Sequence, residues 1–267
     1  MSVQTLYTAA TGMSSLETKL DTIANNLANT ETTSYKRARA NFEDLFYRQE
    51  KLPGAEDNAG QLTATGIAIG LGTRVSSIQT DFKQGAFKNT GNSLDLAIEG
   101  PGFFKLMDPT GQTLYTRSGN YSINANGQLC QGSAETGRLL EPPITIPPDA
   151  LAIVFSPDGK VSVRQPNTPA LTQVGTIELS TFVNPEGLLK MGESLFAETN
   201  ASGTARSLQP GQQGVGVIRQ NTLEASNVEP VSELIDLITT QRAFELNSQV
   251  VRAGDEIMQL VANLRRA

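Results

Sequence analysis

Both ends of the chain place apolar residues at alternating steps of three and four, which is the spacing of a single stripe along a helix. The first stripe falls within residues 4–29 and consists of Leu6, Ala9, Met13, Leu16, Leu20, Ile23 and Leu27. The second falls within residues 228–264, and its last part consists of Leu246, Val250, Ala253, Ile257, Leu260 and Leu264. The pattern predicts two long amphipathic helices of about 39 Å and about 55 Å, at a rise of about 1.5 Å per residue.

These apolar stripes need partners, and two arrangements fit the pattern. The two helices can pair antiparallel within one molecule, or the helices of neighbouring subunits can complete each stripe. A single helix pair buries little surface against the entropy that is lost when two helices become ordered. Coiled-coil-like packing is expected in both arrangements.

Between the two helices, short runs of alternating apolar and polar residues are separated by turn sequences. Hairpins are predicted over residues 103–117, 121–130 and 153–163, around turns that contain Asp, Asn, Pro and Gly. Residues 177–180 are expected to form a further strand, and the glycine-rich residues 52–72 an extended loop. The predicted fold class is α+β, in which long N- and C-terminal helices form a coiled-coil-like domain and the centre is an irregular antiparallel β domain.

This pattern divides the chain into three regions. Residues 1–35 and 226–267 are predicted to form one discontinuous domain of terminal helices that serves assembly. Residues 36–80 are predicted to be an extended linker that carries a loop, and residues 81–225 to be the central β domain.

The composition restricts the chemistry that this chain can perform. Its 267 residues include no histidine, no tryptophan and one cysteine. Nucleophile systems that need histidine, and zinc sites that contain it, are therefore excluded. A lone cysteine forms neither an intrachain disulfide nor a cysteine-based metal site, so Cys130 is interpreted as a small apolar residue. Chemistry that uses a carboxylate pair, a lysine or Mg²⁺ stays open, but the sequence shows no active-site pattern for it, and we expect no enzyme, no cofactor and no metal.

Charge and hydropathy argue against two further classes of protein, nucleic-acid-binding proteins and proteins with a transmembrane helix. The formal net charge of −6 argues against nucleic-acid binding, which needs a basic face. No run approaches the roughly 18 consecutive apolar residues of a membrane span, so no transmembrane segment is predicted. The first residues lack the positive start and apolar core of a cleavable signal peptide.

Polar residues at the end of the first predicted helix allow two interpretations. Asn25, Asn26 and Asn29 are poor helix formers, so they are either exposed or form side-chain hydrogen bonds between packed helices. Lys36, Arg37 and Arg39, with Arg48 nearby, fit a solvated face, or salt bridges to acidic residues of neighbouring subunits, better than a phosphate site.

Several strings along the chain carry a resemblance to a known family. The first joins I-A-N-N-L-A-N-T at residues 23–30 to T-S-Y-K at residues 33–36. The second is G-A-F-K-N-T-G-N-S-L-D-L-A-I-E-G-P-G-F-F at residues 85–104, continued by residues 115–121 and 126–129. The third joins S-N-V at residues 226–228 to Q-R-A-F-E-L-N at residues 241–247. Together they resemble the signatures of the flagellar axial proteins, the rod and hook subunits of the bacterial flagellum.

Within that family the chain is most similar to the subunits of the distal rod. Hook subunits usually carry a further outer β domain, for which this chain has little room. Residues 47–66 resemble an extra stretch of the distal rod subunits, and the resemblance implies a rod-stiffening loop there, with Tyr47, Pro53, Gly54, Gly60 and Gly66. The family usually has glycine at the position of Ser34, and residues 130–143 are a few residues longer here.

The resemblance implies a structural protein whose subunits polymerise into a stiff, hollow helical drive shaft that passes torque from the motor to the hook. The implied partners are further copies of the chain, proximal rod proteins, the hook protein, the P- and L-ring bushing proteins and the flagellar type III export apparatus. The implied location is the periplasmic rod of the basal body, reached without a cleaved signal peptide.

The resemblance also implies which residues pack the terminal helices of many subunits together. These subunit-assembly residues are Leu6, Met13, Leu16, Leu20, Ile23, Asn25, Asn26, Leu27, Asn29, Leu246, Val250, Ile257, Leu260 and Leu264. The alternatives are a proximal rod or hook subunit of the same family and, more remotely, a secreted β-rich glycosidase that uses a pair of carboxylates.

Overall fold

The chain divides into two compact units in a computed structural model that describes residues 3–54, 65–132, 137–166 and 168–264. Unit 1 contains Met1–Ala28, Ala38–Thr80 and Glu229–Ala267. Unit 2 contains Asn29–Arg37 and Asp81–Val228. Each unit is discontinuous in sequence, because the chain passes between them several times.

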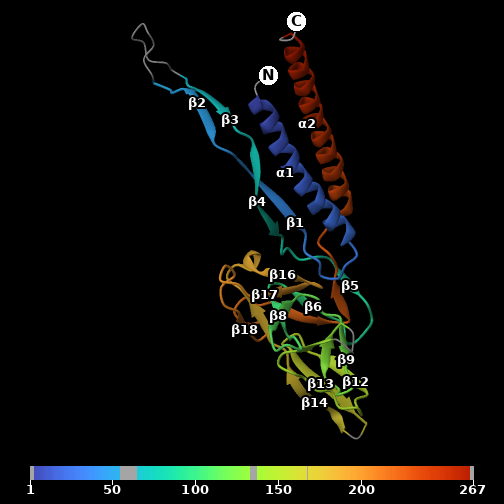
Figure 1. Cartoon of the computed structure of the whole chain (residues 1–267). Coiled ribbons are helices and arrows are strands. Elements are labelled where there is room, and N and C mark those ends of the chain that lie inside the picture. Colours follow the sequence, from blue (N-terminus) through green and yellow to red (C-terminus); the bar gives the residue numbers. More distant parts are fainter. Residues whose placement is uncertain (1–2, 55–64, 133–136, 167, 265–267) are drawn as a thin grey trace. The chain divides into compact units, whose positions relative to one another are not determined.

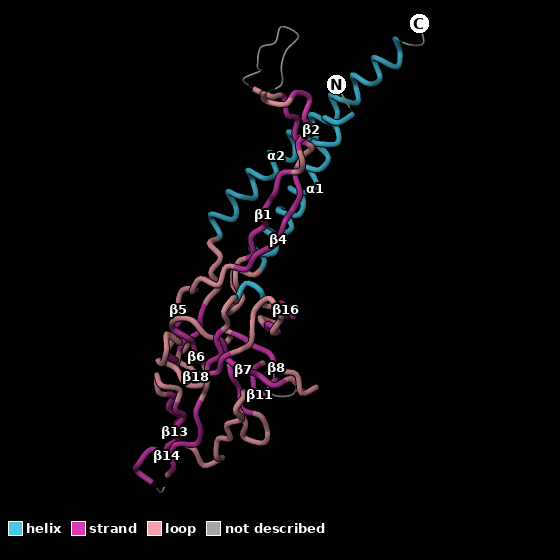
Figure 2. The backbone as a smooth tube through the Cα atoms, turned by 90° about the vertical axis from the view of Figure 1, so that its left-hand side faces the viewer, coloured by secondary structure: helices cyan, strands magenta, loops and turns pink. Residues whose placement is uncertain are grey.

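Unit 1 contains the two long helices predicted from the apolar spacing. α1 is Val3–Ala28 and α2 is Pro230–Leu264, close to the predicted limits of 4–29 and 228–264. The two helices lie side by side in both views of the backbone (Figures 1 and 2). No helix among the described residues is long and apolar enough to cross a membrane.

The two helices run antiparallel, as the contacts at their opposite ends show. Near the start of α1, Leu6 lies against Gly254 in the last part of α2. Near the end of α1, Asn26 Nδ2 donates a hydrogen bond of 3.2 Å to Glu233 Oε2 in the first turn of α2. The fold class is thus α+β with a helix at each end and antiparallel sheets between them.

The rest of unit 1 is a two-part β ribbon formed by part of the predicted linker. Its strands are β1 (Ala38–Asp44), β2 (Tyr47–Lys51), β3 (Ile67–Gly70) and β4 (Thr73–Thr80). β1 pairs antiparallel with β4, and β2 with β3. Backbone hydrogen bonds from Leu45 N to Gly72 O and from Leu71 N to Phe46 O join the two pairs. Figure 1 shows β2 and β3 beyond β1 and β4 along the ribbon. The prediction of a loop over residues 52–72 is therefore wrong at β3. There Ile67 pairs with Lys51 and Ile69 with Arg48, so β3 continues the ribbon as a strand.

Unit 2 contains the antiparallel sheets of the β domain. Its strands are β5 (Phe87–Asn89), β6 (Leu96–Glu99), β7 (Phe103–Met107), β8 (Thr113–Thr116), β9 (Tyr121–Ile123), β10 (Leu129–Gln131), β11 (Arg138–Leu140), β12 (Ala152–Phe155), β13 (Lys160–Gln165), β14 (Thr168–Thr176), β15 (Leu179–Thr181), β16 (Leu189–Gly192), β17 (Leu195–Ala197), β18 (Arg206–Leu208), β19 (Val217–Gln220) and β20 (Thr222–Glu224), with a 3₁₀ turn at Pro185–Gly187. The largest sheet has the order β16-β17-β8-β7-β11-β10-β9, and β15 pairs with both β7 and β18.

The three predicted hairpins are confirmed. β7 pairs with β8, β9 with β10, and β12 with β13, each antiparallel. The strand predicted at residues 177–180 is shifted and spans Leu179–Thr181. The hairpins could be predicted from the turn residues alone, because each turn joins two strands that follow one another in the sequence.

The core of unit 2 consists of two hydrophobic clusters on opposite faces of β7. Phe104 and Leu106 point into the larger cluster, which also holds buried residues of β6, β13 and β15. Phe103 points to the other face and meets Tyr115 and Phe196 in an aromatic cluster, where the Phe103 and Phe196 ring centroids are 5.9 Å apart. Alternation of side chains along a strand accounts for this division.

Candidate assembly surface

The predicted apolar stripe of α1 lies on a side of the helix that is partly or fully buried within unit 1. Ala9 and Ile23 are buried, and the other members are half-buried: Leu6, Met13, Leu16, Leu20 and Leu27. A second buried stripe holds small polar residues, among them Ser15 and Thr22. Ser15 lies beside the ribbon, where Thr73 Oγ1 donates a hydrogen bond of 3.5 Å to its hydroxyl.

Asn26 joins three elements of unit 1 and is almost fully buried. Its Nδ2 donates to Ala38 O at 2.8 Å and to Glu233 Oε2 at 3.2 Å, while its Oδ1 accepts from Ala38 N at 2.9 Å. Asn26 thus holds the first residue of β1 and the first turn of α2 against α1. The other two predicted asparagines differ, since Asn25 is exposed and Asn29 belongs to unit 2, where its Oδ1 accepts from Thr32 Oγ1 at 3.0 Å.

The stripe by which α2 meets α1 is small and polar. Glu233, Thr240 and Gly254 are buried along it, and Asn247 is half-buried. A Cβ atom at Gly254 would collide with the side chain of Leu6, so glycine here permits the close approach of the two helices. Steps of seven residues separate these four positions, which therefore lie along one side of α2.

The aliphatic stripe predicted for α2 borders this contact stripe, because Val250 follows Asn247 by three residues and Ile257 follows Gly254 by three. Leu246, Val250, Ile257 and Leu260 keep exposed fractions of 62%, 39%, 36% and 63% in the single chain. The stripe extends toward the start of α2 through further exposed aliphatic residues, namely Val231, Ile235 and Ile238. The side chain of Leu264 lies outside the described residues. An apolar surface of this extent on a helix marks an interaction surface.

The ribbon adds a second exposed apolar surface to unit 1. Every residue of β2 is exposed, Tyr47 among them, and the preceding Phe46 is more exposed still. Among the loop residues predicted to stiffen a rod, Pro53, Gly54 and Gly66 are exposed, and Gly60 lies outside the described residues. A hydrogen bond to Asp44 raises the pKa of the Tyr47 phenol.

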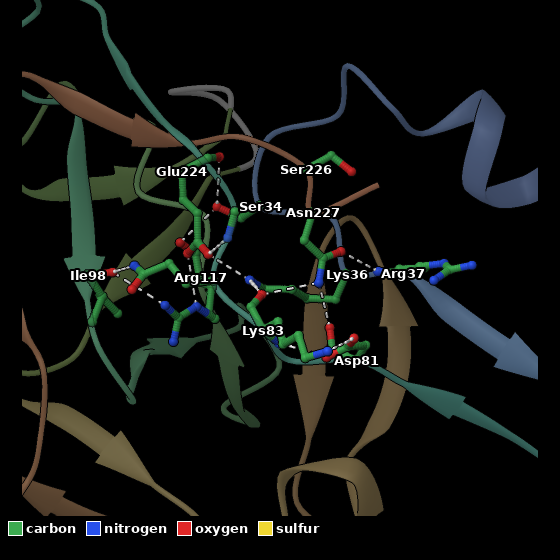
Figure 3. Close-up of polar contacts among 12 residues, drawn as sticks. Ser34, Lys36, Arg37, Asp81, Lys83, Ile98, Arg117, Glu224, Ser226 and Asn227 are labelled. Atoms are coloured by element: carbon green, nitrogen blue, oxygen red, sulfur yellow. Dashed lines mark hydrogen bonds and ion pairs between the residues drawn. The ribbon is translucent and has the colours of Figure 1, made fainter. Parts of the chain in front are cut away.

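Unit 2 holds a buried ion cluster that the sequence did not predict (Figure 3). Lys36 Nζ lies 2.6 Å from Glu224 Oε1, and Arg117 Nε lies 3.0 Å from Glu224 Oε2. The side chains of Lys36 and Glu224 have no exposed surface, and that of Arg117 has 4%. Burial lowers the pKa of Lys36, while the Glu224 carboxylate opposes that shift. Lys36 is thus neither solvated nor available to a neighbouring subunit, so both expectations for the basic residues are wrong at Lys36.

The hydrogen bonds of Arg117 are directed at the turn between β6 and β7. Its guanidinium donates to Gly100 O from both Nη atoms at 3.1 Å, to Gly102 O at 3.0 Å and to Ile98 O at 3.3 Å. Because Nε donates to Glu224 Oε2, every nitrogen of the guanidinium group has a hydrogen-bond acceptor. A buried cation costs little only when it is paired and fully hydrogen-bonded in this way.

A second polar contact in unit 2 lies where three segments of the chain meet (Figure 3). Asn227 Oδ1 accepts from Arg37 N at 2.7 Å, and its Nδ2 donates to Asp81 O at 2.8 Å and to Lys83 O at 3.1 Å. Arg37 O in turn accepts from Asp81 N at 2.8 Å. One amide side chain therefore satisfies backbone groups of two distant segments, a role that the family string S-N-V did not disclose.

Ser34 has a backbone conformation that favours glycine, the residue that the family resemblance implies at this position. It is buried with φ +56°, in the left-handed region that glycine adopts most readily. The serine hydroxyl donates to Arg117 O at 3.0 Å, and its N–H donates to Glu224 O at 2.9 Å. The hydroxyl thus adds a contact to the ion cluster that glycine cannot make.

The described residues contain no cluster of metal-ligating side chains. No group of three or more Cys, Asp or Glu side chains in this part of the chain is placed to hold a metal ion. Cys130 is buried with a free thiol, as expected for a small apolar residue. The exposed apolar residues of α2 and of the ribbon are therefore the candidates for an assembly surface.

Three families match successive parts of the chain. Residues 6–36 match the family described as flagella basal body rod protein, and residues 97–163 match flagellar hook protein FlgE/F/G D1 domain. Residues 219–264 match flagellar basal body rod FlgEFG protein C-terminal. The matched regions cover most of α1, all of α2 and about the first half of the β domain.

Curated relatives resemble the chain over its whole length. The flagellar basal-body rod protein FlgG of Caulobacter vibrioides is 41% identical, with 98% of this chain and 100% of the relative covered. The FlgG protein of Borreliella burgdorferi is 38% identical, with 99% of this chain and 99% of the relative covered. The FlgG protein of Bacillus subtilis is 37% identical, with 99% of this chain and 100% of the relative covered. The chain therefore belongs to the family of flagellar basal-body rod proteins.

Proposed function

We propose that this chain is a structural subunit of the distal rod of the flagellar basal body. Copies of it polymerise into a stiff, hollow helical shaft that transmits torque from the motor to the hook. The relatives that span its full length carry the name flagellar basal-body rod protein, which supports this assignment over a hook subunit or a glycosidase.

The observation that carries the proposal is the outer face of α2. This face consists of aliphatic residues that border the α1 contact, and in the fold of one chain Leu246, Val250, Ile257 and Leu260 keep exposed fractions of 36–63%. Burying apolar surface stabilises association by about 25 cal/mol per Å². A neighbouring subunit that covers this face therefore supplies a driving force for polymerisation.

The predicted subunit-assembly residues then have two different roles. Those of α1, including Leu16, Leu20 and Ile23, help to hold unit 1 together. Those of α2, including Leu246, Ile257 and Leu260, meet neighbouring subunits. Coiled-coil-like packing among the helices of many subunits belongs to this proposal.

The ribbon braces adjacent subunits in this proposal. An isolated two-stranded ribbon is marginally stable in water, and the exposed Phe46 and Tyr47 offer apolar contacts. Neighbouring copies that pack on these residues, and on the loop residues Pro53, Gly54 and Gly66, would oppose bending of the rod.

The place of the protein follows from the same assignment. We propose the periplasmic rod, reached through the flagellar type III export apparatus without a cleaved signal peptide. Its partners there are proximal rod proteins, the hook protein and the P- and L-ring bushing proteins, besides further copies of the chain.

The test is an Ile257→Asp substitution in a strain that depends on this chain for its rod. A charge on the outer face should abolish rod growth, because a carboxylate cannot be buried unpaired between helices. Gln259→Asp is the matched control, since it adds the same charge to an exposed position off the stripe. Electron microscopy of isolated basal bodies measures the rods. Full-length rods with Ile257→Asp, or equal loss in both variants, would contradict the proposal.

A further inference from the structure

The chain passes between unit 1 and unit 2 four times, after residues 28, 37, 80 and 228. On the side of unit 2, the last three of these passages end at Arg37, Asp81 and Val228. A covalent chain transmits tension, so each passage is a route by which a force on unit 1 reaches unit 2. The contacts of unit 2 beside these passages therefore determine how such a force is distributed.

These three passages come together at the side chain of Asn227, which directly precedes Val228 (Figure 3). Its Oδ1 accepts from Arg37 N at 2.7 Å, beside the passage after residue 37. Its Nδ2 donates to Asp81 O at 2.8 Å and to Lys83 O at 3.1 Å, beside the passage after residue 80. Asn227 itself belongs to the passage after residue 228, so its amide group binds the backbone of the other two.

Further hydrogen bonds join the segments of unit 2 that lead to these passages, which are residues 34–37, 81–86 and 224–228. Each segment is bonded to both of the others, by backbone groups and by the ion cluster. The bonds run from Lys36 Nζ to Lys83 O at 2.7 Å, from Asp81 N to Arg37 O at 2.8 Å, from Ser34 N to Glu224 O at 2.9 Å, from Asn227 N to Tyr35 O at 3.3 Å, from Ala225 N to Ala86 O at 2.8 Å and from Gly85 N to Glu224 Oε1 at 2.9 Å. The three segments thus form one network within unit 2.

This network changes how unit 2 resists a pull on one passage. A segment that is held alone peels away one hydrogen bond at a time, and each bond is weak by itself. A segment that is bonded to two neighbours is released only when several bonds break together, which slows forced opening. Asn227 can hold both neighbours because an amide group has a donor and an acceptor, whereas a carboxylate has only acceptors.

We propose that Asn227 couples three passages of the chain mechanically, so that they share a load on unit 1 before it reaches the β domain. This inference rests on the proposed function, because transmission of torque is what loads a rod subunit. It identifies a contact within the subunit through which part of that torque passes. The three passages then act in parallel, and a pull on one of them does not open the β domain through that passage alone.

The substitution that tests this coupling is Asn227→Asp, which changes the chemistry of the side chain at nearly constant volume. Aspartate keeps an acceptor for Arg37 N but loses the donor to Asp81 O and Lys83 O. It also turns a carboxylate oxygen toward these two carbonyl oxygens. Under load, the rate at which unit 2 opens should rise at least about tenfold, because two hydrogen bonds are lost.

The opening rate is measured by single-molecule force spectroscopy on the purified full-length protein at one constant force. The force acts through handles on Val231→Cys, just beyond the passage after residue 228, and on Leu151→Cys in the β domain. Both substitutions replace exposed side chains, whereas the natural Cys130 is buried and does not take a handle.

Two controls separate mechanical coupling from a loss of stability. Asn184→Asp removes a comparable donor, since Asn184 Nδ2 donates to Ala201 O at 3.1 Å elsewhere in unit 2, and it should leave the opening rate unchanged. In the second control the handles are on Leu151→Cys and Val183→Cys, which are both exposed in unit 2. This pair does not load the passages, so Asn227→Asp should then open at the rate of the natural chain.

A measurement in cells connects the coupling to the rod. In a strain that depends on this chain, Asn227→Asp should form rods in unchanged number, because the substitution lies in unit 2 and outside the candidate assembly surface. When the motors turn against a viscous medium, broken rods should accumulate severalfold faster than in an Asn184→Asp strain. With the motors stopped, the two strains should not differ. Electron microscopy of isolated basal bodies counts the broken rods.

The outcomes separate this coupling from the function on which it rests. An unchanged opening rate through the Val231 handle, or an equal rise in Asn184→Asp, would overturn the coupling. An equal rise with both pairs of handles would also overturn it, because Asn227 would then only stabilise unit 2. Rods of Asn227→Asp that withstand the load as well as those of Asn184→Asp would show that torque does not pass through this contact. Normal rods with Ile257→Asp would instead contradict the proposed function and leave the opening rates as they are.

Discussion

Replacement of Glu224 by glutamine is the sharpest perturbation of unit 2, because it removes one buried charge at nearly constant volume. Glu224 Oε1 accepts from Lys36 Nζ at 2.6 Å and from Gly85 N at 2.9 Å, and Oε2 accepts from Arg117 Nε at 3.0 Å. In glutamine, one of the two oxygens becomes an NH₂ group that faces a donor. Both cations then lose their counter-charge.

The expected cost follows from the burial of the three groups. Removing one partner of a buried ion pair leaves an uncompensated charge and costs about 3–5 kcal/mol. Burial already lowers the pKa of Lys36, so without Glu224 the ammonium group would lose its proton more readily and recover part of this cost. Because small domains are stable by about 5–15 kcal/mol, the loss is a large fraction of the total.

The assay is amide hydrogen exchange of β7 and β8 in the purified full-length protein, since these strands report on unit 2. The free energy of opening should fall by about 3–5 kcal/mol in Glu224→Gln. Glu99→Gln is the matched control, because the Glu99 carboxylate is 52% exposed and lies 3.5 Å from Arg219, which is 49% exposed. An exposed pair of this kind contributes less than about 1 kcal/mol.

Two results would refute the reasoning. A loss below about 1 kcal/mol in Glu224→Gln would mean that water or rearrangement compensates the buried cations. An equal loss in Glu224→Gln and Glu99→Gln would mean that burial does not set the cost. Lys36→Met should destabilise unit 2 less than Glu224→Gln, because it leaves Glu224 paired with Arg117 and removes the cation that burial disfavours.

Two further predictions concern Ser34 and Tyr121. Ser34→Gly should leave the free energy of unfolding almost unchanged. Glycine relieves the strain of the left-handed φ by about 1 kcal/mol, and the lost hydrogen bond of the serine hydroxyl costs about 1 kcal/mol. The free energy of unfolding of Ser34→Ala should be about 1 kcal/mol lower than that of Ser34→Gly. Equal free energies of the two variants in urea unfolding would contradict this reasoning. The Tyr121 hydroxyl is buried without a hydrogen-bond partner among the described residues, so Tyr121→Phe should stabilise the protein by about 1 kcal/mol at neutral pH. Burial raises the pKa of Tyr121 well above 10.0 and that of Tyr115 to about 12, so the unfolded state loses these protons first and stability declines as pH rises above 10. Tyr121→Phe should make that decline shallower by about 1.4 kcal/mol per pH unit, and an unchanged slope in pH-dependent unfolding would refute the assignment.

Local patterns in the sequence determined the elements of this protein. The alternating steps of three and four located both long helices to within two residues, and turn residues located three hairpins. These features depend on residues that are close in sequence, so periodicity and turn chemistry are enough to specify them. Strings shared with the flagellar axial proteins indicated the family, which the full-length relatives then established.

The tertiary structure alone decided which surfaces meet. Periodicity showed an aliphatic stripe on α2 but not its partner, and α1 packs instead on the small, polar side that contains Thr240 and Gly254. The burial of Lys36 could not be predicted from the sequence either, because Glu224, which pairs with it, is 188 residues away in the sequence. Burial of a charge, and the choice between two faces of a helix, depend on groups that only the folded chain brings together, so no local pattern could have specified them.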